Sequence, residues 1–180
     1  MGFQTEPSSS PIADIHRYLR SGYAGGSWSG TDLSSSAAAS ATARNTALGY
    51  AESSAMFGTG GGAFAGVVVD DSAIFIRYTS YGDANLDGLV NARDLYALAA
   101  NWQLSGKFWF EGDFNYDGTV STADLNLLAG SWHSGSAALG RALDTLGLPE
   151  IHVPEPATTA AATIWATNRG EAGKSRPRVL

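Results

Sequence analysis

The sequence DANLDGLVNARD at residues 83–94 recurs thirty residues later as DFNYDGTVSTAD at residues 113–124. Ca²⁺ is a hard cation that takes six to eight oxygen ligands, and a twelve-residue loop supplies them from positions 1, 3, 5, 7, 9 and 12. Position 7 contributes its carbonyl, and position 9 often acts through water. In both copies positions 1, 5 and 12 are Asp and position 3 is Asn. The pattern therefore predicts two calcium loops.

Ordinary turn chemistry is the alternative, because Asn, Asp and Gly dominate turns for local reasons, and position 12 is Asp where Glu is usual. A turn, however, requires neither a carboxylate at position 12 nor the same polar residues in a second copy. Gly88 and Gly118 stand at position 6, where the loop must turn sharply. We therefore expect two Ca²⁺ ions. The predicted ligands are Asp83, Asn85, Asp87, Leu89, Asn91 and Asp94 in the first loop, and Asp113, Asn115, Asp117, Thr119, Ser121 and Asp124 in the second.

Each loop is followed by the same apolar pattern at i, i+3, i+4 and i+7, which predicts one helical face. Asn91 and Ser121 stand where a helix N-cap belongs, each with an Asp three residues later, as in a capping box. Val90 and Val120 at position 8 favour a short strand contact between the two loops. The apolar residues are Leu95, Leu98, Ala99 and Trp102 after the first loop, and Leu125, Leu128, Ala129 and Trp132 after the second.

No amphipathic helix is expected before either loop, because residues 73–79 are strand-like and residues 107–111 are too few. A duplicated Asp-x-Asn-x-Asp-Gly loop followed by a short helix resembles the dockerin domain, over residues 81–132. The resemblance implies a small all-α pair of calcium loops with exiting helices, which docks onto a cohesin partner and often attaches polysaccharide-degrading enzymes to a scaffold. It also implies partner contacts at loop positions 10 and 11. These are Ala92, Arg93, Thr122 and Ala123, where the family often has a Ser-Thr-like pair.

The chain has 180 residues, a net charge of −6 and no cysteine. The aspartates at positions 1, 5 and 12 of the two loops account for that charge, and no basic cluster lies outside the extreme C-terminus. Nucleic-acid binding is therefore disfavoured. Disulfides and thiolate metal sites are excluded. The first residues lack the basic and apolar regions of a secretory signal, so the sequence predicts either an intracellular protein or the tail of a longer one.

The first 80 residues predict a small α+β unit. Within it, residues 12–28, 34–35, 47–51 and 78–79 resemble the module that precedes dockerin-like repeats in large bacterial surface proteins. A helix is expected from Ile12 to about Gly22, with Ile15 and Leu19 on its buried side and His16 packed or at the solvent edge. Residues 34–43 favour a weak helix. Residues 46–52, 65–70 and 73–79 predict three strands.

Two further segments are expected after a tandem calcium-binding domain at residues 81–133. Residues 134–152 predict a short helix and a linker. Residues 153–180 begin with Val153-Pro154-Glu155-Pro156, which resembles the start of a PEP-CTERM sorting signal; a Pro-rich linker is the alternative. The apolar run at residues 160–166 is far shorter than the roughly twenty residues that a membrane span needs. We therefore expect a degenerate, disordered tail with no stable membrane insertion.

These features predict a calcium-dependent interaction module of an extracellular or surface protein rather than an enzyme. The three histidines His16, His133 and His152 are scattered, and the carboxylates suited to acid–base chemistry are mostly assigned to the loops. Two alternatives remain open at this point. One is a structural tail domain stapled by calcium, without a cohesin partner. The other is the tail fragment of a carbohydrate-active enzyme.

Overall fold

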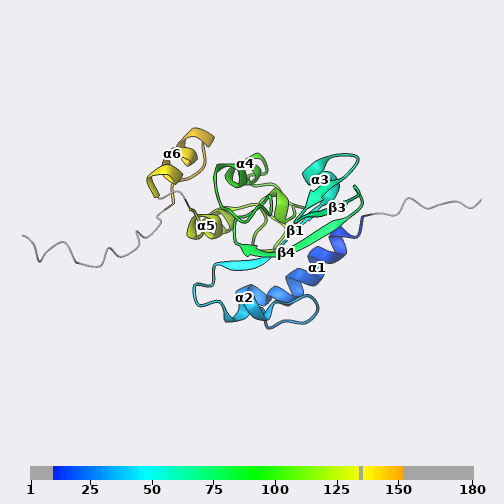
Figure 1. Ribbon diagram of the computed structural model, residues 1–180. Coiled ribbons are helices and arrows are strands. Elements are labelled where there is room, and N and C mark those ends of the chain that lie inside the picture. Colours follow the sequence, from blue (N-terminus) through cyan, green and yellow to red (C-terminus); the bar gives the residue numbers. More distant parts are fainter. Residues whose placement is uncertain (1–9, 134–135, 152–180) are drawn as a thin grey trace, which may run out of the picture.

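The computed structural model describes residues 10–133 and 136–151, and these fold into an α+β structure (Figure 1). The helices are α1 (Ile12–Tyr23), α2 (Ser36–Ser40), α3 (Ser53–Phe57), α4 (Ala92–Ala100), α5 (Thr122–Gly130) and α6 (Ser136–Leu146), with the 3₁₀ helices η1 (Ala24–Gly26) and η2 (Trp109–Glu111). The strands are β1 (Thr46–Glu52), β2 (Gly62–Phe64), β3 (Val67–Val69) and β4 (Ile74–Ser80). The predicted tail at residues 153–180 lies outside the described residues.

The main sheet pairs β1 with β4 in antiparallel register, from Thr46 opposite Ser80 to Glu52 opposite Ile74. Both strands were predicted, β1 with the same bounds and β4 one residue earlier. Strand β1 contacts both α1 and η2. A Cβ on Gly49 in β1 would lie 2.5 Å from Leu86 and 2.7 Å from Trp109, so only glycine permits this close approach.

The prediction of one strand at residues 65–70 is wrong in length. Ala65 and Gly66 have φ values of 50° and 84°, so they form the turn of a small hairpin. Only Val67–Val69 is extended, and it pairs with β2 rather than with the main sheet. Helix α3 and strand β2 were not predicted, because the glycines at residues 58–62 obscure both periodic patterns.

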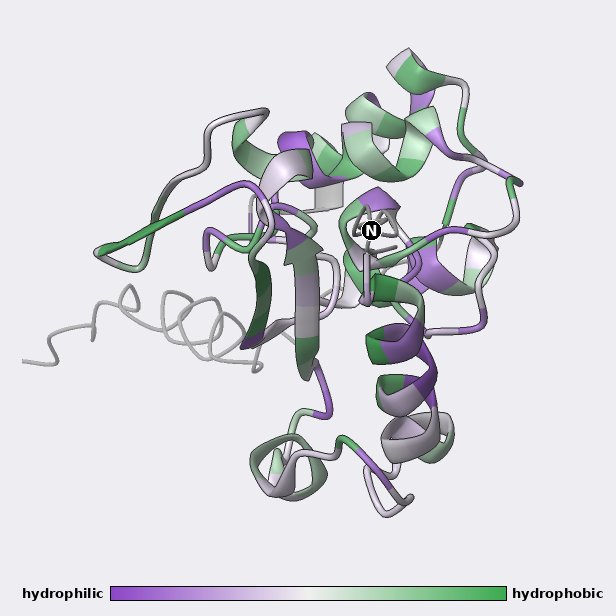
Figure 2. Cartoon of the chain, turned by 90° about the vertical axis from the view of Figure 1, so that its right-hand side faces the viewer, coloured by the Kyte–Doolittle hydropathy of each residue, from purple (hydrophilic) through white to green (hydrophobic). Residues whose placement is uncertain are grey.

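Helix α1 follows the predicted amphipathic pattern, and Figure 2 shows its hydrophilic and hydrophobic residues on different sides. Ile12 and Leu19 are buried, and the Ser10 hydroxyl accepts the Ile12 N–H at 3.2 Å. The helix ends where Ala24 adopts a left-handed conformation. The weak helix expected at residues 34–43 is present as α2, capped by the Ser35 side chain.

The all-α description of the calcium-loop region is wrong. The chain enters the first loop from β4, and between α4 and α5 it forms η2 and an antiparallel bridge between Ser105 and Thr119. The backbone around each position-8 valine is extended and must find hydrogen-bond partners outside a helix. It therefore pairs with other extended segments and gives the region β character. The predicted α+β character of the N-terminal unit fits the structure in part.

An aromatic cluster fills the core around Tyr116, which stands at position 4 of the second loop and is fully buried. Its ring centroid lies 5.0 Å from that of Tyr23, 5.5 Å from Trp109 and 5.8 Å from Trp28. It stacks on Tyr50 at 6.3 Å. Side chains from before and after residue 80 thus share one core, while the predicted division of the chain into domains stays a prediction.

Candidate calcium-binding loops

The first carboxylate of each loop organises the turn that follows it. Asp83 Oδ1 accepts the Asp87 N–H at 3.1 Å, and its Oδ2 accepts the Gly88 N–H at 3.0 Å. In the second loop, Asp113 accepts the equivalent N–H groups of Asp117 and Gly118 at 3.2 and 3.0 Å. The same two bonds at the same two positions show that the repeated sequence produces a repeated structure.

The carboxylate at position 12 closes each loop. In the first loop, Asp94 Oδ1 accepts the Ala84 N–H at 2.9 Å and the Asn85 N–H at 3.3 Å, and Oδ2 accepts the Asn91 N–H at 2.9 Å. Asp124 makes the equivalent bonds with Phe114, Asn115 and Ser121 at 2.9, 3.1 and 2.9 Å. These bonds join the beginning of the loop to the start of the exiting helix.

The predicted capping boxes are confirmed in both helices. In α4, Asn91 Oδ1 accepts the Arg93 N–H at 2.9 Å while Asp94 accepts the Asn91 N–H. Helix α5 has the same arrangement, with Ser121 as its N-cap. Positions 9 and 12 thus begin the helix and close the loop at once.

Positions 3 and 5 are more exposed than positions 1 and 12. Asn85 Oδ1 accepts the Asp87 N–H at 2.9 Å, and Asp87 Oδ1 accepts the Leu89 N–H at 2.8 Å. The second loop repeats both bonds at 2.9 and 2.8 Å. Each side-chain oxygen keeps a second lone pair, so these bonds leave acceptor capacity for a cation.

Two positions in each loop have left-handed backbone. Gly88 and Gly118 have φ values of 93° and 86°, as predicted for the sharp turn at position 6. Leu86 and Tyr116 at position 4 have φ values of 58° and 59°, which is uncommon for side chains of this size. Both side chains are buried, which the calcium-loop pattern did not predict.

The carboxylates at positions 1 and 12 are fully buried. Burial raises the pKa of Asp113 to about 7, with the nearby Asp124 carboxylate adding to the shift. Burial also raises the pKa of Asp94 to about 6 and raises those of Asp83 and Asp124. Removing a carboxylate from water is costly unless a cation or hydrogen bonds compensate. Four buried carboxylates therefore favour a bound cation.

The donors in each loop fit Ca²⁺ by their chemistry. They are hard oxygens, and no Lys or Arg in the described residues forms an ion pair with Asp83, Asp94, Asp113 or Asp124. Across residues 10–133 and 136–151, no three His, Cys, Asp or Glu side chains converge into a metal cluster. A calcium loop draws half of its ligands from outside those residue types. The assignment of individual ligands stays a prediction.

The predicted strand contact between Val90 and Val120 is wrong. Instead, each valine pairs with the segment that follows the helix of the other repeat. The Val120 carbonyl accepts the Gln103 N–H at 2.9 Å, and the Val90 carbonyl accepts the equivalent His133 N–H at 3.3 Å. His133 Nδ1 also accepts the Val90 N–H at 3.1 Å. The two repeats therefore cross over each other.

Two glycines outside the predicted calcium loops allow the two repeats to approach closely where they cross. Gly82 and Gly112 each precede a loop, with φ values of 90° and 109°. A Cβ on Gly82 would lie 2.7 Å from Leu128 Cα, and one on Gly112 would lie 2.7 Å from Leu98 Cα. Each loop thus packs against the helix of the other repeat. The thirty-residue spacing of these glycines was the signal that could have revealed the contact.

Other residues outside the repeated pattern support the loops. The Thr79 hydroxyl donates to Asp83 Oδ2, Trp109 Nε1 donates to the Asp83 carbonyl at 2.7 Å, and Arg77 donates to the Leu86 carbonyl. His16 lies at 2.6 Å from the Tyr50 hydroxyl and 3.9 Å from Asp113 Oδ2, and burial lowers its pKa. Its expected position as a packed histidine is confirmed.

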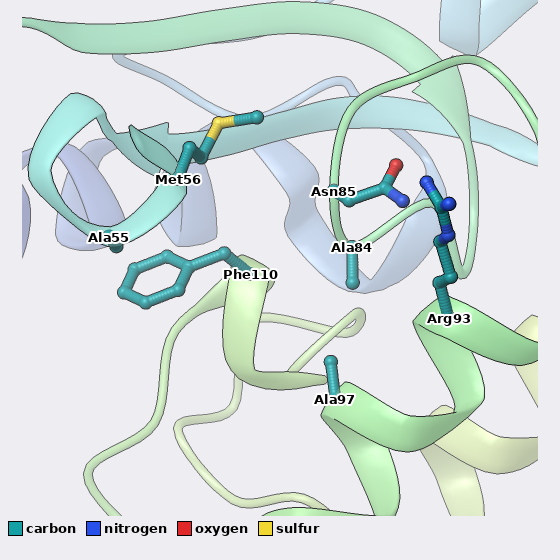
Figure 3. A pocket seen from close by; sticks show the side chains of 7 residues that line it. All are labelled: Ala55, Met56, Ala84, Asn85, Arg93, Ala97 and Phe110. Atoms are coloured by element: carbon teal, nitrogen blue, oxygen red, sulfur yellow. The ribbon is translucent and has the colours of Figure 1, made fainter. Parts of the chain in front are cut away.

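The four residues at loop positions 10 and 11 are exposed at the starts of α4 and α5. They are Ala92, Arg93, Thr122 and Ala123. Their role in partner binding stays a prediction. Arg93 also lines an open pocket together with Asn85 and Phe110 (Figure 3).

Residues 81–131 match the family model described as the dockerin type I domain. The chain matches no curated protein and no solved structure. The match supports a dockerin domain over these residues, which is a class of calcium-binding, non-catalytic protein interaction module. Among the described residues, no helix is long and apolar enough to cross a membrane.

Proposed function

We propose that residues 81–133 form a docking module that binds two Ca²⁺ ions through the twelve predicted loop ligands. The observation that carries this proposal is the duplicated pair of buried carboxylates, at positions 1 and 12 of each loop, with matching hydrogen bonds. The bound ion supplies the positive charge that compensates for these buried groups. The chain contributes the side-chain oxygens and the carbonyls of Leu89 and Thr119.

Calorimetric titration of the full chain with Ca²⁺ tests this function. We expect two binding sites and a higher melting temperature in Ca²⁺ than in EDTA, because binding only to the folded state stabilises that state. A melting temperature unchanged by EDTA, together with no heat of binding, would contradict the proposal.

The docking partner on this proposal is a cohesin-like protein that contacts the exposed starts of α4 and α5. The two starts differ in chemistry, since Ala92-Arg93 offers a guanidinium where Thr122-Ala123 offers a hydroxyl and a methyl group. A partner that recognises charge would therefore prefer α4, and a symmetric two-way binding mode is disfavoured.

Arg93→Ala, compared with Ala123→Ser, tests this partner surface in saturating Ca²⁺. We expect Arg93→Ala to weaken binding to a candidate cohesin by about 1 to 3 kcal/mol through loss of a charge-assisted contact. Ala123→Ser should have a smaller effect. Equal affinities for the wild type and Arg93→Ala would show that the start of α4 is not the recognition surface.

The wider context that we propose is an extracellular or surface protein, non-enzymatic in this chain, whose parent takes part in polysaccharide degradation. The dockerin match supports this context because dockerin domains occur in extracellular proteins. Residues 1–80 would act as a structural neighbour of the module, and the PEP-CTERM-like segment at residues 153–180 as a degenerate sorting signal.

A second candidate is a calcium-stapled structural domain without a cohesin partner. One observation favours it: Tyr116 of the second loop lies in the core shared with α1 and β1, and its hydroxyl donates to the Leu48 carbonyl at 2.9 Å. On this candidate, Ca²⁺ would stabilise the N-terminal unit as much as the loops. Hydrogen exchange of β1 and β4 amides with and without Ca²⁺ would measure this coupling.

A further inference from the structure

An open pocket of about 210 Å³ adjoins the first calcium loop and extends beyond the segment that matches the dockerin model (Figure 3). Helix α3 forms one wall with Ala55 and Met56, which precede that segment. In Figure 3, Arg93 lies beside Asn85 at one end of the pocket, and Phe110 lies beside Ala55 at the other. The remaining lining residues are Ala84 and Ala97.

The second repeat places larger side chains at the positions that open this pocket. Ala84 corresponds to Phe114, which is fully buried, and Ala97 corresponds to Leu127, which packs against the core. Arg93 corresponds to Ala123. Two small residues and one cation therefore distinguish the first repeat from the second at the positions that line this pocket.

The pocket has a polar end and an apolar end, and Arg93 is the one charged residue among those that line it. None of its seven lining residues is acidic. Arg93 is exposed and makes no ion pair with any residue in the described part of the chain. Met56 and Phe110 supply an apolar wall in the same pocket as the guanidinium. A ligand that complements both ends carries an apolar side chain next to a carboxylate.

We propose that this pocket is a docking subsite for a partner protein that inserts an aliphatic side chain against Met56 and Phe110 and places an adjacent carboxylate on Arg93. The inference rests on the proposed docking function and deepens it, since it makes α3 of the N-terminal unit part of the recognition surface. The second repeat lacks this combination, because it has Phe114, Ala123 and Leu127 at the equivalent positions.

Blocked tetrapeptides titrated into the ¹⁵N-labelled full chain in saturating Ca²⁺ test the subsite. The probe is acetyl-Gly-Leu-Glu-Gly-amide, and its matched controls replace Leu by Ser or Glu by Lys. We expect the probe to shift the resonances of Met56, Arg93 and Ala97, and to bind at least about tenfold more tightly than either control. The Lys peptide loses a charge-assisted hydrogen bond that is worth roughly that factor. The Ser peptide loses the burial of an aliphatic side chain, which is worth roughly a similar factor.

Ala97→Leu places the residue of the second repeat in the pocket and should abolish the shifts. Ala100→Leu makes the same change at an exposed position of α4 outside the pocket and should preserve them. Arg93→Gln removes the charge but keeps the aliphatic stem and a hydrogen-bonding end, and so separates loss of charge from loss of folding. This variant should bind the Glu and Lys peptides with equal affinity.

Equal binding of the three peptides, or full binding to Ala97→Leu with an intact spectrum, would overturn the subsite. An absence of peptide binding to a chain that binds two Ca²⁺ would also overturn it, while leaving the proposed function in place. Peptide binding by a chain that takes up no Ca²⁺ would instead contradict the proposed function and keep the subsite. The failure of the subsite and the failure of the proposed function are therefore distinguishable.

Discussion

The two calcium loops have the same hydrogen bonds but different surroundings. The first loop lies beside Arg77, whose guanidinium would be 3.3 Å from a Cβ on Gly88, whereas a Cβ on Gly118 in the second loop would have no neighbour within 4 Å. The second loop instead places Asp113 near His16 and buries Tyr116 among aromatic residues. The repeated residues therefore fix the loop itself, and the residues between them fix what each loop is attached to.

Position 4 carries much of this difference. Both side chains reach β1, Leu86 beside Gly49 and Tyr116 beneath the Leu48 carbonyl. Tyr116 is the larger and contacts four aromatic rings. The second loop is thus joined to α1 and β1 through one large aromatic side chain, whereas the first loop is joined to β4 by bonds from Thr79 and Arg77.

Tyr116→Ala is expected to have the largest effect on stability. Removing a fully buried aromatic side chain leaves a cavity and should lower the free energy of unfolding by about 3 to 5 kcal/mol. Urea denaturation measured by tryptophan fluorescence tests this, with Leu86→Ala as the matched change in the first loop. A smaller loss for Tyr116→Ala than for Leu86→Ala would show that the second loop is not the main attachment.

Asp83→Ala and Asp113→Ala compare the two loops as metal sites. Each change should remove the Ca²⁺ site of its own loop. The other loop should still bind Ca²⁺ in part, because its own predicted ligands form a complete set. At roughly a hundredfold excess of Ca²⁺ over the dissociation constant, each lost site should lower stability by about 2.7 kcal/mol. Calorimetric titration counts the sites, and two unaltered sites in either variant would contradict the ligand assignment.

Stability without calcium should fall as the pH rises. The pKa values of about 6 for Asp94 and about 7 for Asp113 lie above the value of about 3.9 for an unfolded Asp. Between about pH 4 and about pH 7 the folded chain therefore holds more protons than the unfolded chain, so the free energy of unfolding decreases across this range.

Urea midpoints in EDTA and in Ca²⁺ across the same range check this sign. Each unit by which a pKa is raised can change the free energy of unfolding by at most about 1.4 kcal/mol. Ca²⁺ should oppose the decrease because the ion binds the ionised carboxylates. Stability in EDTA that rises with pH would show that these carboxylates are already compensated by the chain.

Much of the candidate site could be predicted from the sequence, because loop chemistry is local. The six predicted ligand positions, the glycine turns and the capping residues Asn91 and Ser121 all lie within the twelve-residue loops. The crossing of the repeats could not be predicted in the same way. It depends on the contacts of Gly82 with α5 and of Gly112 with α4, which join segments far apart in sequence.

The fold outside the loops was predicted where periodicity was clear and missed where it was not. Strands β1 and β4 follow apolar runs without glycine clusters. Strand β2 and helix α3 are short, and their neighbouring glycines resemble a loop. The all-α description failed because it assigned only the helices of the repeat and left the extended backbone at Val90 and Val120 without hydrogen-bond partners.

Tyr116→Phe is expected to have the smallest effect on stability, and it gives the sharpest test of how the two loops differ. It keeps the aromatic packing and removes only the hydroxyl that donates to the Leu48 carbonyl at 2.9 Å. A net loss of about 0.5 to 1.5 kcal/mol is expected for one such bond. If this bond ties the second loop to β1, calorimetry should show weaker Ca²⁺ binding at the second site and unchanged binding at the first. Equal weakening at both sites would mean that the crossed repeats respond as one unit, and that the second loop has no attachment of its own.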